Sequence, residues 1–454
     1  MAEVYPFIGT RFNSQLIGNL SKVICPPADA VAPDMENELH ERHEQNIIRL
    51  EKGRAEAEDD RFSNRYTRAA NILGTWRSDG VFIEDEKPSF YLLQQVFTGA
   101  DGEQKQRTGF VAKVRLEEDQ PLQREPNAGI SAAQAEHLEL MRATNANVSA
   151  IPAVFADPDK EILSLINTWT KDRPWEELTD DCGVTHRLWV IQKKDMLLNL
   201  VEAMKPHDLF IAEGHHRYMA AMAYRDEMRA EGGKSDGKQP YDFVMMALFP
   251  AQQDGLNFSA THRGLTKVIM RDVDLKEAVE ELDQHFAIKK TKIDLGNTVA
   301  AAAQLQAALA EKGKDQPSIC MVHATGTAWY LTLREDVSIE ELYDGLGIPP
   351  CIAALDACIL HNLIINQVFV GNPEYELEDD ECIYTPSAEG LLEMIAAKKV
   401  VCGFILNPIS VQQMVELSSS SPVVPLELGV LSPRTCTGLV LRNLQTDIRK
   451  PARK

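Results

Sequence analysis

The stretch Asp208–Tyr218, which reads D-L-F-I-A-E-G-H-H-R-Y, brings several ionisable side chains together. Glu213, His215, His216 and Arg217 lie within five residues, which is more titratable chemistry than a structural turn requires. A guanidinium offers paired donors that match a phosphate or a carboxylate. A histidine exchanges a proton near neutral pH, and a buried glutamate can act as a general base or hold a metal indirectly. The sequence therefore predicts a site for a small anion, with Glu213, His215 and His216 as its catalytic candidates.

The elements around this stretch are predicted to present it to a ligand. The apolar run Leu209–Ala212 is typical of a strand, and Met219–Ala230 is typical of a helix that ends at Gly232 and Gly233. At such a corner the free N–H groups and the dipole of the helix favour an anion. Gly214 lets the backbone approach that anion closely. We therefore predict that Gly214 and Arg217 bind phosphate or substrate.

Structural interpretations compete with this one. The two histidines could cap backbone groups or bond to a buried carboxylate. Adjacent histidines are poor joint zinc ligands, because helical positions i and i+4 share a face, and we assign no metal ligand. The second His-Arg pair, in Thr261–Arg263, is by itself typical of a satisfied surface patch. The corner at Pro26 and Pro27 is a rigid bend or a pocket wall with Asp29 facing inward, and the segment alone favours the bend.

Composition excludes several classes of protein. With 454 residues the chain is long enough for two or three domains, and its net charge of −21 would repel nucleic acid. The apolar run Phe243–Ala251 is too short to span a membrane, and Met1–Gly9 does not resemble a signal peptide. The eight cysteines form no C-x-x-C pair, which favours reduced thiols over a disulfide framework or a zinc knuckle. We expect a cytoplasmic protein without a nucleic-acid or membrane partner; self-association stays open.

The order of the expected elements predicts a mixed α/β or α+β fold. Composition changes near residue 265, which suggests an N-terminal and central region, 1–265, that carries the E-G-H-H-R corner, and a C-terminal α+β region, 266–454, that packs on it. The expected strands are 4–7, 20–25, 90–97, 108–116, 151–155, 185–191, 242–249, 321–323, 328–333 and 399–406, and the expected helices are 34–42, 64–77, 131–141, 160–166, 194–204, 274–285, 299–310 and 355–370.

Several motifs in order resemble one family across nearly the whole chain. F-I-A-E-G-H-H-R-Y-M-A-A-M-A-Y-R-D-E is similar to the hallmark I-A-D-G-H-H-R-Y-x-T-A-L-x-Y-R-D-E of the domain-of-unknown-function 1015 family. Supporting stretches are L-S-K-V-I-C-P-P-A-D (20–29), N-R-Y-T-R-A-A (64–70), R-A-T-N-A-N-V-S (142–149), G-V-T-H-R-L-W (183–189), T-H-R (261–263) and F-I-L-N-P (404–408).

The corner also resembles that of the ParB/sulfiredoxin-like superfamily, one branch of which comprises ADP-dependent free-serine kinases. This resemblance implies a ParB/sulfiredoxin-like core and phosphate transfer to or from serine, O-phosphoserine or a similar hydroxy metabolite, with ADP or ATP and Mg²⁺. It implies that Arg217 and the backbone of Gly214–His216 hold phosphates. Glu213 or a histidine would move the hydroxyl proton. The remaining substrate-binding residues would be Asp29, Glu125, Thr261, His262 and Arg263.

The chain departs from the family pattern in three places. In the loop Gln123–Ala128 only Glu125 matches the usual P-H-E-K-T, and Ala28 replaces the tyrosine of P-P-Y-D. Near the C-terminus Glu427, Leu428 and Gly429 replace a lysine, a serine and a threonine. A glutamate beside a polyphosphate costs about 4 kcal/mol at an effective dielectric of 20. Two hypotheses follow: a small-molecule kinase, or a catalytically impaired paralogue that binds a metabolite or a partner protein.

Overall fold

The structure is a computed structural model, and it describes residues 2–99, 102–117, 131–267, 275–343, 348–372, 375, 377, 381–420 and 428–445. It divides into two compact units. The described residues up to Asn257, together with those from Leu431 onward, form unit 1, and those from Phe258 to Val430 form unit 2. Strands and helices alternate in both, so the predicted mixed α/β class is confirmed. None of the helices in the described ranges is long and apolar enough to cross a membrane.

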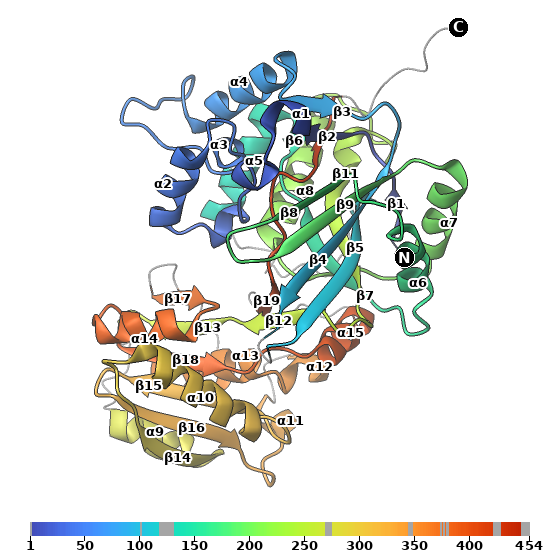
Figure 1. Cartoon of the computed structure of the whole chain (residues 1–454). Helices are drawn as coiled ribbons and strands as arrows, with labels where there is room; N and C mark the ends of the chain where they lie inside the picture. Colours follow the sequence, from blue (N-terminus) through green and yellow to red (C-terminus); the bar gives the residue numbers. More distant parts are fainter. Residues whose placement is uncertain are drawn as a thin grey trace, which may run out of the picture. The chain divides into compact units, whose positions relative to one another are not determined.

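Unit 1 is built on a mixed sheet with the strand order β10-β7-β11-β5-β4-β9-β8, and β1 also pairs with β5 (Figure 1). β7 and β11 run parallel, whereas the pairs β1–β5, β4–β5, β5–β11, β4–β9, β8–β9 and β7–β10 are antiparallel. β11 is buried along its whole length, as its apolar run predicts. The strands are β1 (Val4–Tyr5), β4 (Phe90–Thr98), β5 (Gln104–Arg115), β7 (Ile151–Phe155), β8 (Glu176–Thr179), β9 (Thr185–Ile191), β10 (Phe210–Ile211) and β11 (Phe243–Pro250).

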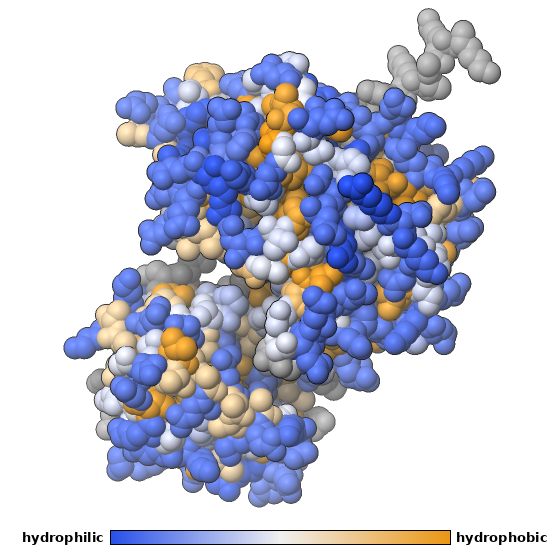
Figure 2. Space-filling view, viewed as in Figure 1, coloured by the Kyte–Doolittle hydropathy of each residue, from blue (hydrophilic) through white to orange (hydrophobic). Residues whose placement is uncertain are grey.

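Helices cover this sheet on both sides, as Figure 1 shows. α5 packs against α8 and α4 in one group, and α6 packs against α7 and β5 in another. On the face drawn in Figure 2 the surfaces of both units are mostly hydrophilic, which agrees with the high content of charged residues. The helices of unit 1 are α1 (Ser14–Ile17), η1 (Leu20–Lys22), η2 (Ala28–Ala30), α2 (Pro33–Arg42), α3 (Ile48–Glu51), α4 (Arg65–Ser78), α5 (Ala132–Thr144), α6 (Glu161–Trp169), α7 (Lys194–Met204), α8 (His215–Ala230) and η3 (Pro240–Asp242).

The C-terminal strand β20 (Leu441–Asn443) belongs to unit 1. It lies between β2 (Gly9–Phe12) and β6 (Ala146–Asn147), and β3 (Phe82–Glu84) completes the four-stranded sheet. Arg442 is fully buried there and donates to Asn147 Oδ1 at 3.1 Å and to two backbone carbonyls. The units thus differ from the expected regions 1–265 and 266–454, because the end of the chain pairs with its beginning. A linear change in composition carries no information on such a pairing.

The strand expected over residues 20–25 is wrong. The segment forms the 3-10 helix η1, and only an isolated bridge from Cys25 to Thr437 remains of strand pairing. The side chain of Asn19 accepts the backbone N–H of Ser21, which favours a turn over a ladder. The prolines that follow have no N–H to donate to a sheet. The chain then turns into η2, which carries Asp29.

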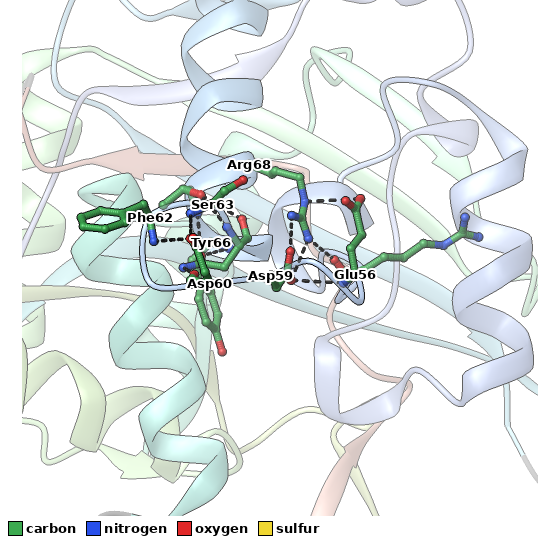
Figure 3. Close-up of polar contacts among 10 residues, drawn as sticks. Glu56, Asp59, Asp60, Phe62, Ser63, Tyr66 and Arg68 are labelled. Atoms are coloured by element: carbon green, nitrogen blue, oxygen red, sulfur yellow. Dashed lines mark hydrogen bonds and ion pairs between the residues drawn. The ribbon is translucent and has the colours of Figure 1, made fainter.

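A polar loop fixes the start of α4, as Figure 3 shows. Asp60 Oδ1 accepts the backbone N–H groups of Phe62 and Ser63, both at 2.7 Å. Arg68 reaches back to the carboxylate of Asp59, and Asn64 caps the helix in a capping box. This loop sets the orientation of the first turn of α4.

Unit 2 contains an antiparallel sheet with the order β14-β16-β15-β18-β13-β17, and α10 and α14 pack on it through a shared apolar core. The helix expected over 355–370 is present as α13 (Asp356–Ile359), continued by the π-helix η4 (Leu360–Val370). β12 (Asn257–Ala260) and β19 (Gly429–Ser432) pair with each other in a separate two-stranded sheet. The other elements are β13 (His262–Leu265), α9 (Leu275–Leu282), β14 (Phe286–Lys292), α10 (Thr298–Lys312), β15 (Ser318–His323), β16 (Thr327–Leu333), α11 (Ile339–Leu342), α12 (Pro350–Ala353), β17 (Cys382–Thr385), α14 (Ala388–Ala396), β18 (Cys402–Leu406) and α15 (Val411–Ser420).

Candidate functional site

The E-G-H-H-R stretch forms the corner between β10 and α8 in unit 1. The backbone N–H of Ala212 donates to Pro152 of β7 at 2.9 Å, so the strand is held to the sheet up to the corner. Gly214 is the N-cap of α8 with φ 84°, and it provides no side chain to cap the first helical amides. The predicted strand, corner and helix are therefore all present. The first helical turn starts at His215 and includes Arg217, as the sequence predicts.

Arg217 lies against the corner that carries it. Its Nη1 donates to the carbonyl of Ala150 at 2.7 Å and to Ser149 Oγ at 3.4 Å. Its Nη2 is buried, lies 4.0 Å from Asp29 Oδ1, and has no hydrogen-bond acceptor among the residues that the structure describes. A buried guanidinium nitrogen that lacks an acceptor is costly, and a ligand oxygen would relieve that cost. The hydrogen bonds of Nη1 therefore position Arg217, and Nη2 can still donate a hydrogen bond to a ligand.

Glu213 is buried, with 5% of its surface exposed. Within the described part of the chain neither carboxylate oxygen has a hydrogen bond, although Arg434 Nε lies 3.2 Å from Oε2. The separation is that of an ion pair, but the N–H does not point at the oxygen well enough for a hydrogen bond. Burial raises the pKa of Glu213, and the charge of Arg434 offsets part of that rise. This carboxylate is the least satisfied acidic group of the corner.

Arg434 reaches the corner from the C-terminal segment of unit 1. It pairs with Asp29 as well as with Glu213. Burial alone would raise the pKa of Asp29, but the positive charges of Arg217 and Arg434 outweigh it and lower that pKa. Asp29, Glu213 and two arginines thus form one cluster, which we call the corner cluster.

A row of polar side chains across three strands holds the segment that carries Arg434. His186 of β9, Gln95 of β4 and Arg107 of β5 are direct cross-strand neighbours. Arg107 is fully buried, donates twice to Gln95 Oε1, and also donates to the carbonyls of Ser432 and Pro433. Gln95 Nε2 donates to the carbonyl of Arg434 at 3.0 Å. Burial lowers the pKa of Arg107 to about 9, which leaves it cationic at neutral pH.

His215 and His137, both near the corner, are neutral at physiological pH. Burial, followed by the charges of His216 and Arg217, lowers the pKa of His215 to about 4. His137 of α5 also has a pKa lowered to about 4 by burial and by Arg217. His216 Nδ1 lies 3.1 Å from Ser131 Oγ. Neutral imidazoles can exchange hydrogen bonds with a ligand but contribute no positive charge toward a phosphate.

A cavity of about 150 Å³ opens beside Asp29. Its polar wall includes Glu51, Arg65, Tyr66 and His137. Glu51 is buried, and burial raises its pKa. Drug-sized ligands occupy roughly 300 Å³ or more, so this cavity suits a small metabolite and is too small for a whole nucleotide.

Thr261, His262 and Arg263 lie in unit 2, on and beside β13, each with 2% or less of its surface exposed. Their interpretation as a surface patch is therefore wrong, because β13 pairs on both sides with β17 and β18. Nε and Nη1 of Arg263 are buried without hydrogen-bond partners, and its guanidinium lies over the ring of Tyr384. Asp29 and residues 213–217 share unit 1, whereas this triplet does not. Glu125 falls outside the described residues.

Gly214→Ala is expected to disturb the corner. At φ 84° an alanine costs about 1–2 kcal/mol, and its Cβ would approach the Arg217 guanidinium to 3.0 Å. Urea unfolding should show that loss of stability. Gly232→Ala, at a similar φ of 96° but with no atom near the added Cβ, provides the matched control for backbone strain alone. Equal loss of anion binding in both variants would contradict a special role for the close approach of Arg217.

Acid is expected to loosen unit 2 through His262. Leu406 N–H donates to its Nδ1 at 3.2 Å, and burial lowers its pKa to about 4. The unfolded histidine takes up a proton near pH 6.5 and the folded one only near pH 4, so the free energy of unfolding falls by about 3 kcal/mol across that window. Hydrogen exchange of β18 amides, corrected for intrinsic rates, measures this. His262→Asn should flatten the dependence, whereas His285→Asn should not; an unchanged slope in His262→Asn would contradict the assignment.

Sequence reasoning overlooked several residues of the site. Arg107, Gln95 and His137 had no local signature, because each meets the corner only through long-range packing. Weak signals existed for two others: Ser149 ends the motif R-A-T-N-A-N-V-S, and Arg434 lies in the degenerate C-terminal signature.

The chain belongs to the family described as protein of unknown function DUF1015, whose model matches residues 4–358. None of the curated proteins compared with it matches. Three solved structures show a distant likeness to this chain. The first is a conserved hypothetical protein from Pyrococcus furiosus, with 9% identity and a TM-score of 0.32; the match covers 70% of this chain and 90% of that one. The other two are described as a free serine kinase in complex with AMP. One of these two is a mutant form, with 12% identity, TM-score 0.30 and coverages of 66% and 80%. The other has 12% identity, TM-score 0.27 and coverages of 68% and 80%.

Proposed function

We propose that this protein is a small-molecule phosphotransferase that takes a phosphoryl group from a nucleotide and passes it to the hydroxyl of a small metabolite such as serine. The observation that carries the proposal is the Glu213 carboxylate, which is buried and accepts no hydrogen bond from any described residue. Such a group is expensive to keep unless a ligand uses it. Its raised pKa brings it closer to the range of an effective general base.

The transfer step assigns one role to each group of the corner. The metabolite hydroxyl gives its proton to Glu213 while its oxygen forms a bond to phosphorus. The bond between that phosphorus and the leaving nucleotide oxygen breaks, and the shortened nucleotide keeps the electron pair. Phosphoryl transfer requires positioning and charge neutralisation above all. Arg217, whose Nη2 lacks an acceptor, and the uncapped amides after Gly214 would supply both.

The ligand classes follow from size and charge. ADP or ATP with Mg²⁺ would supply the phosphoryl group and part of the neutralising charge. Oxygen ligands suit Mg²⁺, and the carboxylate of Asp29 is a donor of that kind. The cavity of about 150 Å³ beside Asp29 accommodates a serine-sized molecule. In unit 2, Arg263 is a buried cation whose Nε and Nη1 lack acceptors among the described residues, and we propose it as a separate candidate for binding an anion.

A second function is favoured by one observation. Arg434 pairs with both Asp29 and Glu213, so the corner cluster neutralises part of its own charge. A paralogue that binds a metabolite or a protein without turnover would tolerate this pairing. The replacement of the family's lysine by Glu427 points the same way.

A melting-shift experiment with ADP, ATP and phosphoserine, each with Mg²⁺, tests the proposal. A ligand at 100 times its Kd stabilises the folded state by about 2.7 kcal/mol, which raises Tm by several degrees. We expect this shift with a nucleotide in the wild type and its loss in Arg217→Ala. Arg142→Ala removes an exposed arginine that pairs with Glu227, and it should keep the shift.

The outcomes separate the two functions. A shift with ADP or ATP, followed by phosphate transfer to serine, supports the phosphotransferase. No shift with either nucleotide overturns it. A shift with phosphoserine alone favours the metabolite-binding paralogue.

A further inference from the structure

A second cluster of chemistry-bearing side chains lies in unit 1, outside the corner cluster. Asp180 follows β8, His186 is on β9, and Cys436 is on the C-terminal segment. Their nearest ligand atoms all lie within 4.8 Å of one another. The sequence separates Cys436 from His186 by 250 positions, so the spacing of cysteines could not reveal the cluster.

The contacts of Asp180 show that one carboxylate oxygen is fixed and the other is aimed at the cluster. Oδ1 accepts the backbone N–H groups of Cys182 at 2.9 Å and Val184 at 3.0 Å in the turn between β8 and β9. Oδ2 lies 2.8 Å from His186 Nε2 and 3.8 Å from Cys436 Sγ. A carboxylate held in this way by its own turn is preorganised, as metal-ligating carboxylates commonly are.

The geometry does not fit a nucleophilic Cys-His-Asp triad. In a triad the acid and the nucleophile contact opposite nitrogens of the imidazole. Here Asp180 and Cys436 both approach Nε2, and Sγ lies 3.1 Å from Nε2 and 3.8 Å from Nδ1. One nitrogen carries a single proton or a single lone pair, so it cannot serve both neighbours in line. Three donor atoms that converge on one point are instead the arrangement of a metal site.

We propose that Asp180, His186 and Cys436 bind a Zn²⁺ ion in unit 1. Thiolate, imidazole and carboxylate are the ligands that zinc takes in proteins, at about 2.0–2.3 Å. Tetrahedral bonds of that length place ligand atoms about 3.4–3.6 Å apart. The observed separations of 2.8, 3.1 and 3.8 Å bracket that range. Cys436 is partly exposed, so its side chain can adjust and the fourth position is open to solvent.

The ion would link the C-terminal segment, through Cys436, to strands β8 and β9 of the sheet. Cys436 lies two residues beyond Arg434, whose carbonyl is held by Gln95, and Gln95 is the cross-strand neighbour of His186. Zinc would thus complete the polar row that positions Arg434. The ion acts as a support of the segment and takes no part in phosphate transfer, so the proposal stands independently of the proposed function.

Cobalt substitution tests the site in the full-length, reduced and chelator-treated chain. Co²⁺ bound through a thiolate gives an intense near-ultraviolet charge-transfer band. Millimolar Mg²⁺ in the buffer occupies weak acidic sites. We expect one equivalent of Co²⁺ with that band, displaced by Zn²⁺, and a higher Tm with Zn²⁺. Loss of an outer-shell partner alone costs 10- to 100-fold in affinity, so Cys436→Ser should abolish the band and weaken Zn²⁺ binding at least about 100-fold.

Two further variants keep the test decisive. Asp180→Asn preserves the turn acceptor at Oδ1 but loses the anionic ligand oxygen, so it should weaken binding in a folded chain. Cys182→Ser removes the exposed cysteine of the same turn and should retain the thiolate band. The proposal is overturned if the reduced chain binds no equivalent of zinc. It is also overturned if the band survives in Cys436→Ser or is lost in Cys182→Ser instead.

Discussion

Glu213→Gln is expected to reduce phosphate transfer roughly 10²- to 10⁴-fold, which is the usual contribution of a positioned general base. The substitution keeps the size and shape of the side chain and removes only its capacity to take a proton. Because Glu213 is buried and neither oxygen has a hydrogen bond, the amide should be accommodated without loss of the fold. Nucleotide binding, measured by the melting shift, should change far less than the rate.

The pH profile distinguishes a base from a merely structural carboxylate. Burial raises the pKa of Glu213, so the acid limb of kcat/KM should lie above the ordinary range of a glutamate and should vanish in Glu213→Gln. Glu227→Gln is the matched control, because Glu227 is on α8, the helix that follows the corner, but pairs with Arg142 on the surface. A rate within threefold of the wild type in Glu213→Gln would show that the proton goes elsewhere.

Local patterns were enough to predict the corner itself. The sequence pattern predicted a strand at Leu209–Ala212 and a helix after Gly214. The charged residues between them therefore had to lie where the strand and the helix meet. Gly214 has φ 84°, a conformation that glycine adopts more readily than other residues, so the residue type was consistent with a tight corner. These features depend on neighbours within a few residues, and periodicity reports such neighbours directly.

Long-range pairings were beyond the reach of the sequence. Nothing near Arg434 indicates that its segment lies across β4, β5 and β9, where Gln95 and Arg107 hold it. Thr261–Arg263 shows the converse failure. Its polar composition suggested a surface patch, whereas a central strand of unit 2 buries it. Arginine is rarely buried, so composition argues against a buried Arg263. Only the pairing of β13 with two other strands reveals that this residue is buried.

The same long-range contacts predict that Arg107→Met strongly destabilises unit 1. Arg107 is fully buried and donates to Gln95 and to the carbonyls of Ser432 and Pro433. Methionine fills much of the space but leaves those acceptors buried without donors. Removal of one partner from a buried charged network costs about 3–5 kcal/mol, and each stranded acceptor accounts for about 1–3 kcal/mol of it. Urea unfolding at pH 7 measures the loss.

Arg187→Met is the control, because Arg187 sits on β9 of the same sheet but bonds to Glu177 at the surface. An exposed pair contributes about 1 kcal/mol or less, so this variant should stay close to the wild type. Arg107→Met should in addition release the segment that carries Arg434, and faster hydrogen exchange at residues 432–437 would report that release. A loss below about 1 kcal/mol with unchanged exchange would mean that the C-terminal segment is held by β20 alone. Arg434 would then reach Glu213 without help from the polar row, and the row would have no part in building the site.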